Sequence, residues 1–388
     1  MSLRPRPLAA HVRSVAFAVS LYFVLLREVR AESSVTYKYE DYREADGRIS
    51  VKAQYGLWQQ DIGTDSVLKV SGALDAIAGA TPTGQPGATA SAPVMLADIH
   101  DRRKAWTADF SRQVARLNFD LGVSNSREGD YVSNGYSLTT VTDFNEKNSG
   151  LVLGIAGNDD DVKVFFQQPW LKKRSVDGIV GLNQVLDKNT TMSFNLTYGR
   201  STGYLSDPYK VILKTTEIVP GVTLPLTFPE NRPSERDKWI AFVSYNHAVE
   251  AYDGALEASY RFFHDSYGSS SHTLSATWFQ NLGAKFILAP TLRYYEQDAA
   301  DFYHVSLNGT GITPLLAPSS QAPYYSADYR LSHLRTVTYG VKLVWHPVDA
   351  VQLDLSYDRY DMKGLDGVTS ASAYPRANTL TAGIRYAW

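Results

Sequence analysis

From residue 34 onward, apolar and polar side chains alternate along many short segments of the chain. Residues 337–345 read VTYGVKLVW, with an apolar side chain at every second position, and residues 351–357 repeat the pattern after the turn HPVDA. Residues 49–57 alternate in the same way. A period of two places apolar side chains on one face of a β-strand. We count about 16 such segments, within a range of about 14–18.

The connections between these segments differ in length in a regular way. Most are either short turns, such as VLDKNT and QNLGAK, or long polar loops, and the two kinds alternate. The long loops are expected near residues 81–100, 125–135, 157–173, 201–236, 264–271, 297–334 and 359–374. Outer-membrane barrels have this arrangement, with short periplasmic turns and long extracellular loops, whereas a soluble sandwich has no reason to adopt it.

The physics of the bilayer explains strands with one apolar and one polar face. In hydrocarbon every backbone N–H and C=O group needs an internal partner, and a closed barrel provides one for each. The apolar faces then contact lipid and the polar faces line a lumen. We therefore predict an all-β fold over residues 32–388, a transmembrane antiparallel β-barrel. The alternative is a soluble all-β protein with a polar-filled interior.

The first 31 residues have the pattern of a cleavable signal peptide. A basic start is followed by a mostly apolar stretch over residues 14–26, and we predict cleavage after Ala31. A short membrane anchor is the alternative. Cysteine is absent from the 388 residues, so no disulfides are expected. The predicted location is the cell outer membrane.

The charge of the chain bears on its partners. Residues 1–31 hold five of the 38 basic and one of the 40 acidic residues, which leaves 33 basic and 39 acidic residues in the predicted mature chain. This acidic balance argues against a nucleic acid partner. Outer-membrane lipid and an envelope protein are the partners that the predicted barrel suggests.

The chain ends on TLTAGIRYAW, an alternating segment with an aromatic last residue. In a barrel the last strand pairs with the first, so we expect it to be ordered to its end. The pattern also resembles the C-terminal signal that the barrel-assembly machinery reads in outer-membrane proteins, which adds this machinery to the expected partners. The resemblance assigns the signal to Ile384, Tyr386 and Trp388.

Several longer stretches resemble a family of Gram-negative envelope proteins known as domain of unknown function 3570. They include MLADIHDRRKAWTADFSRQ from Met95, GRSTGYLSDPYK from Gly199, PENRPSERDKW from Pro229 and YYSADYRLS from Tyr324. The resemblance covers nearly the whole predicted mature chain. It implies an exported β-barrel, and it supplies neither an established activity nor catalytic residues.

The residues with the most chemistry fall where strands run into long loops, which carry function more often than scaffolds do. We expect a mixed ring of acids, arginines and tyrosines at the extracellular mouth, able to select a solute or bind a partner. Packing of the loops through ordinary ion pairs is the alternative. The candidates are Asp207, Tyr209, Glu230, Arg232, Arg236, His264, Asp265, Asp301, Tyr303, Asp328 and Arg330.

Charged residues on the polar strand faces are expected in the lumen. These are Glu257, Arg261, Arg293, Lys342, Asp354 and Asp358, and because their signs are mixed we do not expect strong ion selectivity. Two short acidic stretches are weak candidates for metal binding through oxygen or imidazole ligands. They hold Asp98, His100 and Asp101, and Asp159, Asp160 and Asp161, the latter three expected in a loop. Solvated carboxylates and an ordinary histidine are the simpler interpretation.

The sequence favours a passive channel or uptake porin of unknown solute. A non-conducting barrel that serves as a structural sleeve or docking platform is the alternative. No soluble-enzyme motif is present, and we expect neither enzymatic activity nor a cofactor. A hydrolase at the barrel rim would require a serine and a histidine within hydrogen-bond reach on the outer surface. Ser270, Ser271 and His272 are adjacent in sequence and alternate between faces, which does not suit a nucleophile and its base.

Overall fold

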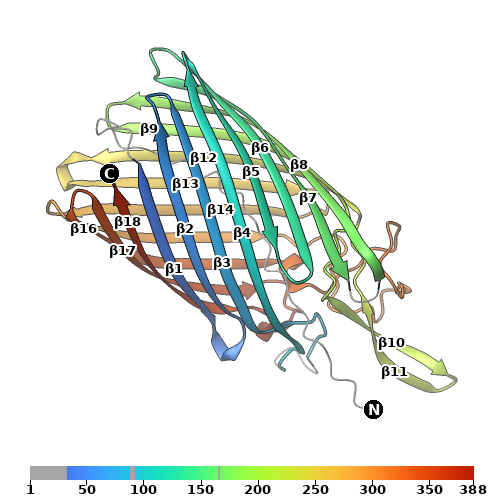
Figure 1. Cartoon of the computed structure of the whole chain (residues 1–388). Helices are drawn as coiled ribbons and strands as arrows, with labels where there is room; N and C mark the ends of the chain where they lie inside the picture. Colours follow the sequence, from blue (N-terminus) through green and yellow to red (C-terminus); the bar gives the residue numbers. More distant parts are fainter. Residues whose placement is uncertain (1–32, 88–91, 165–166) are drawn as a thin grey trace.

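The computed structural model describes residues 33–87, 92–164 and 167–388, so the predicted signal peptide and its cleavage site lie outside the described residues. Sixteen of the 18 strands in the described residues form a closed antiparallel barrel (Figure 1). The other two strands form a separate hairpin. The prediction of an all-β barrel of about 16 strands is therefore confirmed. No helix in this part of the chain is long and apolar enough to span a membrane.

The first half of the wall comes from nine consecutive strands. They are β1 (Ser34–Glu44), β2 (Ser50–Ile62), β3 (Ser66–Pro82), β4 (Leu96–Val114), β5 (Leu117–Arg127), β6 (Tyr131–Phe144), β7 (Ser149–Val164), β8 (Gln167–Asp187) and β9 (Thr190–Gly203). The hairpin follows, formed by β10 (Val211–Val219) and β11 (Val222–Pro229). Seven strands then complete the wall, namely β12 (Glu235–Val249), β13 (Gly254–Asp265), β14 (Ser270–Leu282), β15 (Phe286–Gln297), β16 (Leu334–Val348), β17 (Val351–Gly364) and β18 (Arg376–Ala387).

The barrel closes where β1 pairs with β18. The pairing runs from Ser34 opposite Ala387 to Glu44 opposite Ala377, and the backbone N–H of Trp388 donates to the carbonyl of Ser33 at 2.9 Å. Every backbone group of both terminal strands thus has a neighbour, which a barrel wall in hydrocarbon requires. The chain is ordered to its last residue for this reason.

Side chains alternate between the two sides of the wall. In β16, Tyr339, Val341 and Leu343 are exposed on the outer surface, while Lys342 faces inward. The exposed outer row is apolar because it contacts lipid rather than water, and an inward row of polar side chains follows from the same period of two.

The apolar row expected over residues 49–57 faces the opposite way from the other strands. Tyr37, an outward residue of β1, pairs with Gly56, and so Ala53, Tyr55 and Leu57 of β2 face inward. Lys52 and Gln54 are on the outside. Periodicity alone does not tell which face of a strand is the outer one, and the pairing with β1 decides it.

Three predicted long loops are wrong. Most of residues 157–173 belongs to β7 and β8, most of residues 125–135 belongs to β5 and β6, and half of residues 264–271 belongs to β13 and β14, so these three connections are short turns at the loop end. The loop expected over residues 201–236 contains the β10–β11 hairpin.

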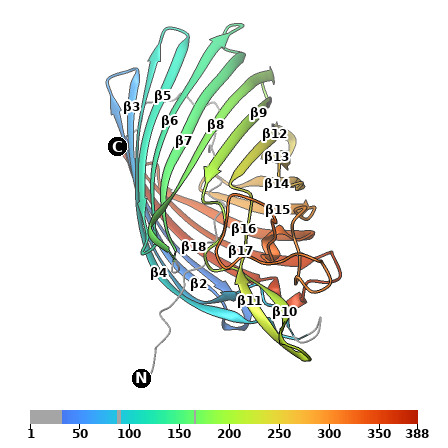
Figure 2. The same cartoon turned by 90° about the vertical axis from the view of Figure 1, so that its right-hand side faces the viewer.

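The two ends of the barrel differ (Figure 2). The C-terminus lies at the end with the short turns, and the long loops gather at the other end, from which the β10–β11 hairpin projects. We call these the turn end and the loop end. In outer-membrane barrels the long loops face the cell exterior, and this rule assigns the loop end to the outside.

Candidate functional site

Residues 204–234 cross the loop end of the barrel, and we call them the mouth bridge. They connect β9 to β12, and β9 lies eight strands from β1 in either direction around the wall. Nevertheless Tyr209 packs against Ile49 and Ile99, beside β1 and β2. The bridge therefore reaches from one side of the mouth to the opposite side.

Main-chain contacts fix the far end of the mouth bridge. The N–H of Val211 donates to the carbonyl of Thr83 at 2.9 Å, just after β3. Gly84 lies at this crossing with a φ of +103°, and a Cβ atom there would stand 2.5 Å from the carbonyl oxygen of Val211. Glycine is thus required both by its backbone conformation and by the close approach of the bridge.

The loop between β15 and β16 packs on the mouth bridge. Asn231 and Tyr325 exchange two backbone hydrogen bonds of 2.9 and 2.8 Å, and the N–H of Leu307 donates to the carbonyl of Leu213 at 2.8 Å. The loop between β17 and β18 joins this assembly, since the hydroxyl of Tyr303 lies 2.6 Å from that of Thr369. Loops from several sides of the barrel form one connected layer.

Six charged residues lie at the centre of this layer, and we call them the mouth cluster. Arg232 forms ion pairs with Glu230 at 2.6 Å and Asp328 at 2.8 Å. Arg330 forms an ion pair with Asp207 at 2.6 Å and bonds to Asp328 through Nε at 2.9 Å. The members are Asp207, Lys210, Glu230, Arg232, Asp328 and Arg330, three acids and three bases.

Lys210 is the most enclosed cation of the mouth cluster, with 1% of its surface exposed. Its ammonium group donates to the carbonyl of Pro82 and lies 5.8 Å from the centre of the Tyr329 ring. Burial lowers the pKa of Lys210, and the negative charges of Asp328 and Asp207 oppose this shift. A buried charge is tolerated only when it is paired and hydrogen-bonded, and the equal numbers of acids and bases meet this condition.

The three acids respond differently to burial. Burial raises the pKa of Glu230 to about 7, although the charge of Arg232 acts in the other direction. At Asp328 burial also acts to raise the pKa, but the charges of Arg330, Lys210 and Arg232 outweigh it and hold the pKa below its usual range. Asp328 is thus the fixed negative centre to which both arginines bind.

The raised pKa of Glu230 predicts a pH dependence. Its ordinary value is 4.5, so proton binding favours the folded mouth fully below pH 4.5, and this contribution is lost as the pH rises through about 7. Asp328 acts in the opposite sense only below about pH 4. We expect the amides of residues 204–210 to exchange more slowly at pH 5 than at pH 8, after correction for intrinsic rates, in hydrogen–deuterium exchange. Glu230→Gln should remove most of this difference, and equal protection of the wild type at both pH values would contradict the assignment.

The remaining mouth candidates form separate groups. Arg236 bonds through Nε to Asp265 at 2.6 Å, and Asp265 in turn accepts from the backbone N–H of Tyr267 at 3.0 Å. The N–H of Asp301 donates to the carbonyl of Tyr267 at 2.8 Å. His264 is on the outer surface of β13, away from the mouth cluster, because it pairs with the outward residue Trp239. Its expected place in the mouth ring is wrong.

The carboxylates at residues 159–161 do not form one site. They lie within β7 rather than in a loop, so Asp160 faces inward and its two neighbours face outward. Each forms its own ion pair: Asp159 with Arg174, Asp160 with Lys173 and Asp161 with Lys172.

The other proposed metal group is also divided. Asp98 and His100 are outward residues of β4, whereas Asp101 faces inward. Asp101 instead lies beside Glu128 and Asp130, and one ligand atom of each is within 4.8 Å of the others. Its carboxylate accepts from the backbone N–H of Gly129 at 3.2 Å, so it also serves to hold this turn.

The six predicted lumen residues all fall on the inner face. The pairing of β13, β14 and β15 places Glu257 opposite Thr277, Arg261 opposite Thr273 and Arg293 opposite Ser275. The orientation of Lys342, Asp354 and Asp358 follows from the pairing of β16 with β17 and of β17 with β18. Arg293 is exposed even though it faces inward in the eighth position of the 12-residue β15. The barrel interior therefore contains solvent-accessible space at this depth.

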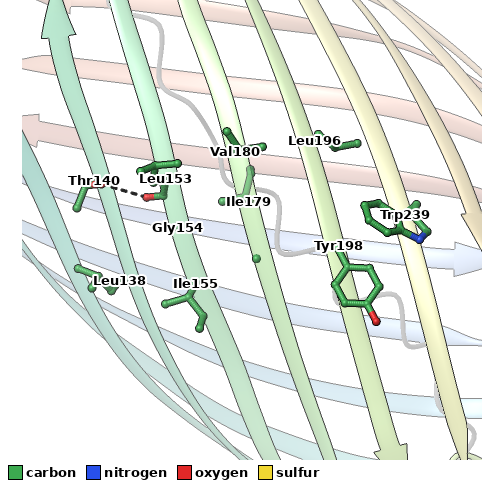
Figure 3. Close-up of a pocket in the computed structure, with 11 residues that line it drawn as sticks. Leu138, Thr140, Leu153, Gly154, Ile155, Ile179, Val180, Leu196, Tyr198 and Trp239 are labelled. Atoms are coloured by element: carbon green, nitrogen blue, oxygen red, sulfur yellow. Dashed lines mark hydrogen bonds between the residues drawn. The ribbon is translucent and has the colours of Figure 1, made fainter.

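A groove of about 470 Å³ lies on the wall over β6, β7, β8, β9 and β12 (Figure 3). Its walls include Leu153, Ile155 and Val180, which are exposed on the outer face, and Tyr198 and Trp239 stand at one side. Its floor contains Gly178, which has no side chain to fill the row. The groove is apolar and faces lipid, so it is part of the membrane contact surface.

A serine and a histidine do meet on the outer surface. His264 Nδ1 lies 3.0 Å from the hydroxyl oxygen of Ser270 on the neighbouring strand. A catalytic base also needs a third group to orient it, and within the described chain no carboxylate bonds to His264. The pair alone does not define a hydrolase, and the lack of enzymatic activity stays a prediction.

The sequence interpretation missed Lys210 as a member of the charged site. Lys210 lies in a stretch without periodicity, and a lone lysine in a polar loop has no pattern that marks it as buried. The only available signal is that it follows the predicted mouth residue Tyr209 directly.

A membrane-type β-barrel with a bridged, charge-stabilised mouth is the class that these features define. The chain belongs to the family described as Protein of unknown function (DUF3570), whose model matches residues 16–388, and the family resemblance seen in the sequence is confirmed. None of the curated proteins matches the chain.

Solved structures show similarity at low sequence identity. The siderophore receptor PirA from Pseudomonas aeruginosa is 12% identical with a TM-score of 0.44, over 92% of this chain and 62% of the receptor. CdiB from Acinetobacter baumannii is 8% identical with a TM-score of 0.49, over 92% of this chain and 60% of CdiB. A bacterial polysaccharide outer membrane secretin is 6% identical with a TM-score of 0.47, over 92% and 98%. The chain thus spans less than two thirds of the length of PirA and of CdiB.

Proposed function

We propose that this protein is an outer-membrane channel that admits small hydrophilic solutes, with passage limited by the mouth bridge. The observation that carries the proposal is the exposure of Arg293 inside the barrel, together with polar inward faces along the neighbouring strands. A lumen built from 16 strands is wide enough to hold water unless loops fill it.

The mouth bridge supports a narrowed channel rather than a wide one. It crosses between opposite walls and is fixed on both sides, by Tyr209 against Ile49 and by the buried ion pairs of the mouth cluster. A bridge held in this way reduces the cross-section of the entrance, so only small solutes would pass beside it.

The test is single-channel recording of the purified, folded protein in a planar bilayer of defined lipid. We expect small, steady conductance steps in potassium chloride that are absent when heat-denatured protein is added. Folding is checked beforehand by heat-dependent gel mobility. Silence from a demonstrably folded barrel would refute a constitutively open channel.

The second candidate function, a sleeve or docking platform for an envelope protein, is favoured by the β10–β11 hairpin. It projects from the loop end (Figures 1 and 2) and exposes Ile218, Val219 and Leu224 by 52%, 55% and 44%. Exposed aliphatic groups of this kind are typical of interaction surfaces. A silent folded barrel would make this hairpin the first region to examine.

A further inference from the structure

Two arginines lie on the inner wall near the loop end of the barrel. Arg261 of β13 and Arg293 of β15 each stand four residues from the loop end of their strand. Between them runs β14, in which Thr273 pairs with Arg261 and Ser275 pairs with Arg293. The two guanidinium groups are close enough that the charge of Arg293 acts on Arg261.

Neither arginine has a counterion. In residues 33–87, 92–164 and 167–388, neither guanidinium forms a hydrogen bond or an ion pair. Their contacts are aromatic: Arg261 lies 5.4 Å from the ring centre of Phe263, and Arg293 lies 5.9 Å from that of Tyr295. Arg236, on the adjacent part of the wall, is by contrast neutralised by Asp265.

The surroundings add hydrogen-bond donors. The inner face of β14 consists of hydroxyl residues, namely Ser271, Thr273, Ser275 and Thr277. The inward acids of the same strand stand four residues from Arg261 on either side: Asp265 is paired with Arg236, and Glu257 lies farther from the loop end. A group of lumen acids that act on one another, Glu40, Asp75 and Asp358, belongs to β1, β3 and β17.

We propose that Arg261 and Arg293 form a binding site for the oxyanion group of a solute, a carboxylate or a phosphate, within the lumen. An arginine fork matches the two oxygens of such a group, and hydroxyls can donate to the remaining ones. Because the two positive charges have no counterion and are partly shielded from bulk water, an anion bound between them would lower their electrostatic free energy. This inference deepens the proposed channel function and rests on it for its transport consequence, a preference for anions.

The binding test does not depend on conduction. Equilibrium dialysis of the folded, detergent-solubilised barrel would measure binding of radiolabelled inorganic phosphate and, separately, of radiolabelled succinate. The test variant is Arg261→Gln/Arg293→Gln. The control is Arg103→Gln/Lys342→Gln, which also removes two positive charges from the inner wall, but next to Asp75 and Asp354.

We expect saturable binding of at least one of the two anions by the wild type and the control, weakened roughly tenfold or more in the test variant. Binding that is absent in the wild type, or equal in the wild type and the test variant, would overturn the site, as would an equal loss in the control. Zero-current potentials in a salt gradient then test transport: the anion preference should fall in the test variant only. Specific binding by a barrel that is silent in the bilayer would uphold the site and refute the channel.

Discussion

Replacement of Arg330 by alanine is expected to release the mouth bridge and to increase single-channel conductance. Arg330 joins Asp207 of the bridge to Asp328 of the loop between β15 and β16. Its removal leaves three buried acids with only two bases, and breaking a buried pair in this way costs about 3–5 kcal/mol. Much of that cost is avoided if the bridge leaves its buried position. We therefore expect larger and noisier conductance steps than in the wild type.

A matched control is Arg200→Ala, which removes an exposed arginine from the rim. Arg200 pairs with Glu235 at 2.6 Å, with 49% and 61% of the side chains exposed. Exposed pairs of this kind contribute about 0–1 kcal/mol, so conductance should stay at the wild-type level. Limited proteolysis provides a second measurement, since residues 204–234 should become cleavable in the Arg330 variant only. Unchanged conductance together with unchanged cleavage would show that the mouth cluster does not hold the bridge.

Replacement of Trp388 by serine is expected to leave most of the protein unfolded in cells while export continues. Trp388 follows the closing strand β18 and lies beside Tyr386 with a ring-centre distance of 6.0 Å. Together with Ile384 these residues form the outward apolar row of the strand that completes the barrel. We propose that the barrel-assembly machinery reads this row. The measurement is the fraction of heat-shiftable, membrane-inserted protein relative to total exported protein.

Trp106→Ser is the control that distinguishes loss of the C-terminal assembly signal from loss of an aromatic contact with lipid. Trp106 is an outward residue of β4, 48% exposed compared with 55% for Trp388, and it is far from the chain terminus. If both variants insert equally well, the terminal row has no special role in assembly. If both fail equally, the effect comes from the lipid-facing surface in general.

The wall of the barrel was predictable from the sequence because each strand carries its own period-two signal. The alternation of short turns and long loops then indicated which end of each strand faces the periplasm and which faces the cell exterior. The inward orientation of the lumen residues Arg261 and Arg293 follows from the same alternation. The reversed orientation of Ala53 and Tyr55 shows the limit, since the period of two separates the two faces of a strand without telling which one is the outer face, and only the pairing with β1 decides it.

The arrangement of the mouth was not predictable in the same way. Asp207 and Arg330 are 123 residues apart, and their contact depends on how two long loops pack against each other over the lumen. The local sequence of either loop contains no information about this packing. Composition indicated that acids and arginines gather at this end. It gave no means to tell the buried pairs from exposed ones such as Arg200 with Glu235, or to find Lys210.

The shared charge cluster has an evolutionary consequence. Surface loops of a barrel diversify most easily when each can change independently of the others. Here a substitution at Asp328 affects both Arg232 and Arg330, which belong to segments about 100 residues apart. We expect these loops to change together or not at all in related chains, whereas the tip of the β10–β11 hairpin, around Val219 and Val222, is free to vary. Antigenic variation would then concentrate on the hairpin, while the layer over the lumen keeps its composition.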